Sequence, residues 1–258
     1  MKVKHLVGAF LCVLGCYACS SPKTEVQSPD GHIKMTLTVD ENGKPFYNVS
    51  VDDSLLIENS AMGFTAANGI ILGEGFQVKN TTFSSEDETW TQPWGENKKN
   101  RNHYNEMAVS LTNEDQVQLT LRFRVFDDGI GFRYEYTVPT VDSLLITDEL
   151  TTFRFHRDGT SWSIPASAET YELLYQQQPI SEVETANTPF TFKTADGVYG
   201  SIHEAALYDF PEMTLKQIGH YTLKAELAPW PDGIKARKGN HFTTSWRTIQ
   251  IAPEVLLS

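Results

Sequence analysis

Cysteine is nearly absent from this sequence, and its scarcity excludes two common sources of stability. Only three cysteines occur, and Cys12, Cys16 and Cys19 all lie near the N-terminus. The rest of the chain therefore has no thiol pair for a disulfide and no thiolate site for a structural metal. With 258 residues, 40% of them hydrophobic, the chain can instead build a core in one large domain or two small ones.

Positive charge is also scarce. The chain has 21 Lys and Arg against 33 Asp and Glu, which gives a formal net charge of −12. This balance provides no general electrostatic attraction to nucleic acid or to an anionic membrane surface, so we expect no nucleic-acid partner. It is compatible with a neutral ligand such as a sugar, or with a local cation site, but it selects neither.

A hydrophobic run long enough for a permanent membrane helix is missing at the N-terminus. The apolar segment LVGAFLCVLG is too short to span a bilayer, and it follows Lys2 and Lys4. This arrangement predicts an export signal over residues 1–19 and a tether over residues 20–25. VLGC resembles a lipoprotein cleavage box, CYAC resembles it less well, and CYA also suits ordinary signal cleavage. We expect either a lipid anchor on Cys16 or Cys19, as the only membrane contact, or a secreted soluble protein.

Familiar catalytic motifs are lacking as well. The chain has no G-x-S-x-G sequence, no glycine-rich phosphate loop and no H-E-x-x-H sequence. Its seven histidines are scattered, and none pairs with another at the spacing of metal ligands. Carboxylates are numerous, but spacing alone does not identify a converging pair of the kind that glycosidases use.

Patterns typical of β-strands fill the rest of the sequence. HIKMTLTV alternates apolar and polar residues, ENGK predicts a hairpin turn, and PFYNVSVDD follows as a second strand. Similar runs recur towards the C-terminus, separated by Asp-Gly turns, and long segments with helical periodicity are absent. DSLLITDEL fits a loop and a strand better than a helix. The pattern predicts an all-β protein built as a large antiparallel sandwich.

Glu204 raises a problem within this β-pattern. In GVYGSIHEAAL, strict alternation places Glu204 on the same face as Ile202, and a buried lone carboxylate is costly unless it is paired or bound to a metal. Either the strand ends before Glu204 or the residue has a partner. The following AALYDFPEM contains Pro211 and lacks alternation, which favours a strand end here, with Glu204 at the rim of the sandwich.

Two stretches are rich in aromatic residues. TWTQPWGENKKNRNHYNEM reads as a polar loop that carries Trp90 and Trp94, and exposed tryptophans beside polar side chains suit sugar binding. The same aromatics could equally anchor a long loop onto the sandwich. Asn105 and Glu106, in the same stretch, are weaker candidates for substrate binding. APWPDGIKARKGNHFTTSWR, with Trp230, fits a solvated loop better.

An ordered series of segments resembles one known family. SPDGHIKMTLTVDENGKPFYNVSVDD, PWGENKKNRNHYNEM, FRVFDDGIGFRYEY, IHEAALYDFPEM and TTSWRTIQIAPEVLLS together resemble the N-terminal domain of glycoside hydrolase family 97. That family comprises bacterial α-glucosidases and α-galactosidases that degrade polysaccharides. The resemblance implies a β-supersandwich over residues 26–253, similar to the galactose mutarotase-like carbohydrate-binding fold. Residues 254–258 would then begin a linker to a (β/α)₈ barrel that this chain does not contain.

The resemblance also implies a role for one residue. In the family, the catalytic carboxylates lie on the barrel, so none can be assigned here and we expect this chain alone to be inactive. In the family, a glutamate of the EAAL motif reaches from the N-terminal domain to the active site, where it helps to bind a calcium ion. By position, the resemblance assigns this role to Glu204. Tyr208 and Asp209 are weaker candidates for the same interface.

The implied partners are an α-linked oligosaccharide and a catalytic barrel of the same family. The implied location is the periplasm or outer membrane of a Gram-negative bacterium. Two other functions stay open. One is a standalone glycan-binding or accessory sandwich without catalytic activity. The other is a mutarotase-type enzyme that would pair His203 with Glu204, which is the least favoured because adjacent strand residues point to opposite faces.

Overall fold

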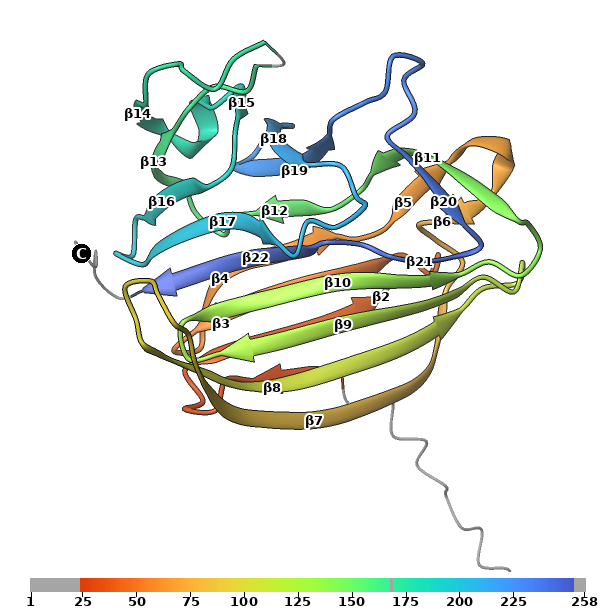
Figure 1. Ribbon diagram of the computed structural model, residues 1–258, viewed down its shortest axis with the longest axis horizontal. Helices are drawn as coiled ribbons and strands as arrows, with labels where there is room; N and C mark the ends of the chain where they lie inside the picture. Colours follow the sequence, from red (N-terminus) through yellow and green to blue (C-terminus); the bar gives the residue numbers. More distant parts are fainter. Residues whose placement is uncertain (1–23, 168, 253–258) are drawn as a thin grey trace, which may run out of the picture.

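The computed structural model describes residues 24–167 and 169–252, and the regular secondary structure of these residues is almost entirely β-strand (Figure 1). Two short 3₁₀ helices interrupt the strands in these ranges, η1 (Ala67–Gly69) and η2 (Ile180–Glu182). No helix of the described part has the length and apolar character needed to cross a membrane. The predicted signal, both candidate lipidation sites and the segment 254–258 lie outside the described residues. The first strand begins at Glu25, the last residue of the predicted tether.

One large sheet organises the molecule. It contains ten strands, and β21 (His241–Thr243) pairs with β10 beside the main path. The order along the main path is β14 (Gln176–Pro179), β13 (Gly159–Ser163), β16 (Phe190–Thr194), β17 (Tyr199–Ala205), β22 (Trp246–Ala252), β10 (Gly129–Thr137), β9 (Gln118–Phe126), β8 (Lys99–Thr112) and β7 (Gln77–Thr91).

Three smaller sheets of four strands each complete the fold. The first is β1 (Glu25–Gln27), β2 (Ile33–Val39), β3 (Pro45–Val51) and β4 (Ser54–Ala61). The second is β20 (Ala236–Gly239), β11 (Ser143–Glu149), β5 (Phe64–Ala66) and β6 (Ile71–Leu72). The third is β12 (Thr152–Arg154), β19 (Thr222–Leu227), β18 (Met213–Gln217) and β15 (Thr185–Ala186).

The layers confirm the predicted all-β antiparallel sandwich. Every paired strand of the described residues is antiparallel to its neighbour. Strands β1 and β2 contact β8 and β9, and Figure 1 shows β2 and β3 behind β9 and β10. The core fills the space between the layers, where each fully buried large apolar side chain contributes about 1.5–3 kcal/mol.

The alternation predicted from the sequence is visible in the burial of the strands. Along β2 and β9 every second side chain faces the core: Ile33, Met35, Leu37, Leu119, Leu121, Phe123 and Val125. The predicted ENGK turn also forms. Gly43 adopts a φ of +73°, and a Cβ at this position would lie 2.3 Å from the backbone nitrogen of Phe76, so only glycine fits.

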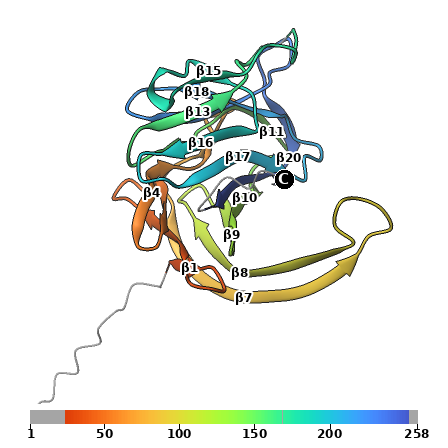
Figure 2. The same cartoon turned by 90° about the vertical axis from the view of Figure 1, so that its left-hand side faces the viewer.

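The stretch from Thr89 to Met107 is not the loop that the sequence predicted. β7 ends at Thr91 and β8 begins at Lys99, so only residues 92–98 connect them. Figure 2 shows these two strands curving out beyond the rest of the sheet as a long arm. Polar pairs across the two strands explain why so hydrophilic a sequence forms strands, because Arg101 donates to both oxygens of Asp87 at 2.7 and 2.8 Å.

Candidate functional site

Glu204 lies on β17 directly opposite Arg247 on β22. The strand continues through Glu204 and ends at Ala205, so it does not end before Glu204 as the sequence favoured. The side chain of Glu204 is only 6% exposed, which would be costly for a lone carboxylate. The second possibility raised by the sequence, a buried partner, is therefore the one that holds.

That partner is a fully buried arginine shared by two carboxylates. The guanidinium of Arg247 donates through Nε and Nη2 to both oxygens of Glu149, at 2.9 and 2.5 Å. Its Nη1 donates to Glu204 Oε2 at 2.7 Å and to the hydroxyl of Ser245 at 2.9 Å. The buried cluster therefore has one guanidinium group for two carboxyl groups.

The surroundings of Glu204 in this cluster shift the pKa of its carboxyl group. Burial raises the pKa of the Glu204 carboxyl above 4.5, and the charge of Arg247 opposes part of that rise. The other carboxylate oxygen, Oε1, accepts the backbone N–H of Met213 at 3.1 Å. Each oxygen is therefore held by one hydrogen bond from the described residues, and a carboxylate oxygen has the capacity to accept a second.

Two cavities meet at Glu204. The smaller, about 270 Å³, is lined by residues of the loop after β17 together with Tyr171 and Glu212, whose side chains are hydrogen-bonded at 2.5 Å. The larger, about 620 Å³, lies between the arm and the face of the main sheet and contains Trp90 and Trp246. The end of β17 therefore borders both the smaller cavity, which contains carboxyl groups, and the larger cavity, which is lined by aromatic residues.

Two residues that line the larger cavity, Arg124 and Trp246, belong to an alternating stack of rings and guanidinium groups. Arg124 lies 4.5 Å from the ring centre of Tyr104 and 4.7 Å from that of Trp246. Arg133 lies 4.7 Å from the Trp246 ring, on the same tryptophan. Cation–π contacts of this kind hold aromatic and charged side chains in a flat array, a surface suited to the apolar face and the hydroxyls of a sugar ring.

The structure separates the candidates for substrate binding. Trp90 is 50% exposed and lines the same cavity as Glu204, whereas Trp94 is 83% exposed in the connection at the tip of the arm and does not line it. Asn105 donates to the backbone oxygen of Gln27 on β1 at 2.9 Å. Glu106 is buried and accepts hydrogen bonds from two arginines of β9. The substrate-binding roles of these four residues stay predictions.

The residues next to Glu204 in sequence do not converge on it. Tyr208 is 81% exposed, and Asp209 accepts a hydrogen bond from Lys238 at 2.9 Å at a different cleft. His203 is exposed on the opposite face of β17 from its neighbour, as alternation predicts, although it borders both cavities at the strand end.

The sequence reasoning missed the two residues that hold Glu204. For Arg247 a signal was present, because it shares the apolar face of β22 with Ile249 and Ile251, so a charge stands where the pattern calls for a hydrophobic residue. For Glu149 the signal was hidden. A register shift in β11 between Ile146 and Asp148 turns Glu149 inward, and strict alternation does not predict this.

The residues around Glu204 can supply part of a calcium site. Within residues 24–167 and 169–252 no group of three or more His, Cys, Asp or Glu side chains gathers as metal ligands. Calcium takes six to eight oxygen ligands, and one carboxylate supplies at most two. The free lone pairs of Glu204 fit a single ligand position, and the remaining ligands would have to come from elsewhere.

Known proteins match this chain in sequence and in fold. It is 25% identical over 246 residues to a retaining alpha-galactosidase from Bacteroides thetaiotaomicron, covering 89% of this chain and 36% of the relative. A glycoside hydrolase family 97 enzyme from Pseudoalteromonas sp. strain K8, solved in complex with acarbose, superposes with a TM-score of 0.85 at 38% identity, over 89% of this chain and 36% of that one. A beta-arabinopyranosidase shares the fold, with a TM-score of 0.81 at 21% identity over 89% of this chain and 40% of its own.

The chain aligns with only part of each of these relatives. The chain spans about 36% of the length of the retaining alpha-galactosidase and of the Pseudoalteromonas enzyme. The family model described as glycosyl-hydrolase 97 N-terminal matches residues 26–256, nearly the whole of the described structure. The chain belongs to this family of glycoside hydrolase 97 N-terminal domains.

Proposed function

We propose that this chain is the N-terminal, carbohydrate-binding-type module of an exported α-glycosidase that degrades glycans. Its task would be to present Glu204 to an active site carried by a (β/α)₈ barrel of the same family. The observation that carries this proposal is the setting of Glu204. Its carboxylate is fixed by Arg247 and Met213 at a strand end, between two cavities, and keeps lone pairs free.

Calcium is the ion that we propose Glu204 helps to hold. A bound calcium ion would orient substrate and stabilise charge that develops at the reacting centre. The protein's part is to keep the carboxylate ionised and correctly aimed. Burial raises the pKa of Glu204, and a bound cation would oppose that rise and favour the ionised form. Arg247 and Met213 hold the two oxygens in one orientation.

The substrate that we propose is an α-linked oligosaccharide. Trp90 and Trp246 flank the larger cavity, with Arg101, Arg124 and Asn102 as polar neighbours that suit hydroxyl groups. Support also comes from relatives, because structures of the Pseudoalteromonas enzyme were solved in complex with panose and with acarbose.

Export is the third part of the proposal. Lys2 and Lys4 before an apolar segment, with Cys16 and Cys19 after it, support secretion to the periplasm or outer membrane of a Gram-negative bacterium. Labelling with a radioactive fatty acid in such a host tests the anchor. Loss of label in Cys16→Ala, with label retained in Cys19→Ala, would assign the anchor to Cys16. Absence of label in the unaltered chain would contradict a lipid anchor.

Calorimetric titration with calcium tests the shared metal site. We expect no heat from this chain alone, because Glu204 supplies too few oxygens. A mixture with a separately produced (β/α)₈ barrel of the proposed kind should bind calcium more tightly than either part. Glu204→Gln should abolish that gain, whereas Glu226→Gln, a glutamate paired with Lys235 on another strand, should preserve it. Equal calcium binding by mixtures with and without Glu204 would contradict the proposal.

A standalone glycan-binding or accessory protein is the second candidate function. The observation that favours it is the larger cavity, whose lining in this chain includes Trp90 and Trp246. Titration with maltose and with galactose separates the two functions. Sugar binding by the lone chain that survives Glu204→Gln and disappears in Trp90→Ala would favour the standalone function. Sugar binding only in the presence of the barrel would favour the module.

A further inference from the structure

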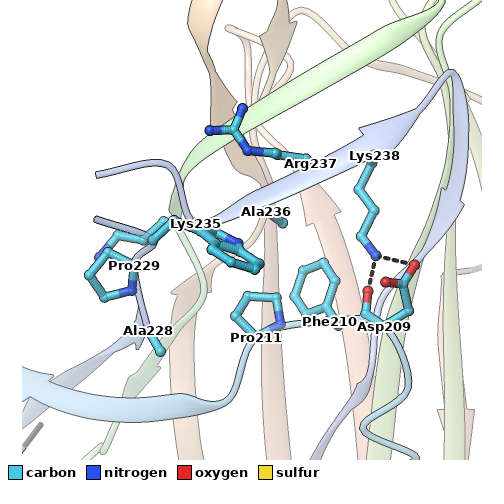
Figure 3. Close-up of a pocket in the computed structure, with 10 residues that line it drawn as sticks. Asp209, Phe210, Pro211, Ala228, Pro229, Lys235, Ala236, Arg237 and Lys238 are labelled. Carbon is cyan, nitrogen blue, oxygen red and sulfur yellow. Dashed lines mark hydrogen bonds and ion pairs between the residues drawn. The ribbon is translucent and has the colours of Figure 1, made fainter. Parts of the chain in front are cut away.

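A third cleft, of about 430 Å³, lies apart from the two cavities at Glu204 and shares no lining residue with them. Its base is formed by Phe210 and Pro211, from the segment between β17 and β18. Its walls are the loop that joins β19 to β20, with Trp230, and the start of β20. Figure 3 shows Phe210 and Pro211 facing β20, where Lys238 reaches down to Asp209.

Trp230 is presented on a rigid turn. The N–H of Gly233 donates to Trp230 O at 2.8 Å, and the N–H of Trp230 donates to Ile234 O at 2.8 Å. Gly233 has a φ of +84°, so the loop is a tight turn closed by a left-handed glycine. Pro229 and Pro231 flank the tryptophan and fix its backbone further. The indole is nevertheless 60% exposed, which a purely structural aromatic side chain does not need.

The loop is also clamped at its base. The ammonium group of Lys235 donates to Glu226 Oε1 at 2.9 Å and to the backbone oxygen of Leu227 at 2.8 Å. Arg237 pairs with Asp232, a residue of the turn itself. These contacts fix the platform before any ligand arrives, so little conformational entropy would be lost on binding.

The charges around the cleft point to a neutral ligand. Its three cations are Lys235, Arg237 and Lys238, and each has a carboxylate partner, in Glu226, Asp232 and Asp209 respectively. The local charge is therefore balanced, and an anion would gain no net attraction. Paired charged side chains still offer N–H donors and carboxylate acceptors in a fixed pattern. An exposed indole beside such an array suits a pyranose ring, whose face is apolar and whose edge carries hydroxyls.

We propose that this cleft is a second carbohydrate-binding site, which takes one pyranose unit of a neutral oligosaccharide. The sugar stacks on the indole of Trp230, and Arg237 and Lys235 donate to its hydroxyls. The sugar class rests on the proposed function, but the cleft does not depend on Glu204 or on Trp90. Its volume is within the range of small-ligand sites, about 300–1,000 Å³.

Titration of ¹⁵N-labelled protein with maltotriose, followed through the indole N–H signals, tests this site by itself. The chain has five tryptophans, so each site reports separately. Trp230→Phe assigns the signal of Trp230. We expect that signal to shift and saturate with maltotriose, and to do so equally at low and high salt. Trp90 reports on the larger cavity in the same spectra, so failure of that site and failure of this one are distinguishable.

Affinity measured by calorimetry completes the test. Trp230→Ala should weaken maltotriose binding at this site about tenfold, which corresponds to the loss of one stacking contact. Trp162→Phe alters a half-buried tryptophan of β13 that lines neither this cleft nor the two cavities at Glu204, and should leave the Trp230 signal and its titration unchanged. The site would be rejected if the Trp230 signal did not respond to maltotriose. It would also be rejected if it responded instead to inorganic phosphate in a salt-sensitive way, or to protein concentration alone.

Discussion

Two clusters of paired charges lie on opposite faces of the main sheet, and they differ chiefly in their access to water. On the inner face, Arg247 is held between Glu149 and Glu204, and these three side chains are 0–6% exposed. On the outer face, arginines and glutamates of β8, β9 and β10 form a ladder whose side chains are 10–32% exposed: Glu106, Arg122, Arg124, Arg133 and Glu135.

This difference in access to water determines which of the two clusters can tolerate an excess of charge of one sign. The outer ladder has three cations and two anions, and water can solvate its surplus positive charge. The inner cluster has one cation and two anions, and its surplus negative charge is removed from water at a considerable desolvation cost. A fold gains little stability from such a buried cluster compared with apolar residues of the same volume. Its presence beside two cavities agrees with the role proposed for Glu204.

Arg247→Met should give the largest effect. It leaves two carboxylates buried without their cation, and breaking a buried pair in this way costs about 3–5 kcal/mol. Unfolding in urea should show that loss in the free energy of unfolding. Arg133→Met is the matched control from the outer ladder, where a 29% exposed arginine should cost about 1 kcal/mol or less. Similar losses in the two variants would remove the distinction between the faces.

Glu106→Gln should have an intermediate effect. Glu106 is the least exposed member of the outer ladder, and it accepts from Arg122 Nη1 and from Arg124 Nε, the latter at 2.8 Å. Its loss removes two charge-assisted hydrogen bonds, but Arg122 keeps Glu135 and Arg124 keeps its aromatic contacts. We expect a loss of about 1–2 kcal/mol in the same urea experiment. A loss as large as that of Arg247→Met would place Glu106 with the inner cluster.

The pH dependence of stability should differ in sign between the two faces. Burial raises the pKa of Glu204 above 4.5, so its protonated form is favoured by folding. Its contribution to stability is then complete below pH 4.5 and is lost as the pH rises through the pKa of the folded state. Relative to Glu204→Gln, the unaltered protein should therefore lose stability as the pH rises towards neutrality.

Glu135 provides the opposite case on the outer ladder. Burial acts to raise its pKa, but hydrogen bonds from Arg122 and Arg133 outweigh that effect and lower the pKa below 4.5. Relative to Glu135→Gln, the unaltered protein should lose stability as the pH falls through the lowered pKa. Thermal unfolding across a pH series gives both curves. Slopes of the same sign for Glu204 and Glu135 would contradict the electrostatic contrast.

The sequence predicted the architecture because the architecture depends on alternation. Ile33, Met35 and Leu37 are buried as the period-2 pattern requires, and Gly43 forms the expected turn. Strands made mostly of polar residues were not predicted, because they lack this alternation of apolar and polar side chains. Residues 84–91 of β7 are all exposed and have no buried apolar face, so this part of the arm resembles a loop in sequence, and only cross-strand pairs such as Asp87 with Arg101 reveal strands.

Of the buried cluster of Glu204, Arg247 and Glu149, the sequence pointed only to Glu204. Glu204 was recognisable because it breaks the apolar face of its own strand, and the resemblance to a family drew attention to it. Its partners come from β11 and β22, far away in sequence, so pairing could be known only from the register of the sheet. Trp246 was likewise invisible as part of the cavity, because its role depends on β22 lying beside β10.

Asp87→Asn should produce the smallest effect and define the lower limit of the comparison. The hydrogen bond from Arg101 lowers the pKa of Asp87, but both side chains are more than half exposed on the arm. Water and salt screen a pair of this kind, and holding two long side chains in one geometry offsets much of the attraction. We expect thermal unfolding at neutral pH to match that of the unaltered protein. A clear drop in melting temperature that disappears at high salt would show that the arm is held by its ion pair rather than by its backbone ladder. Exposed charges would then matter to this fold more than the contrast between the two faces implies.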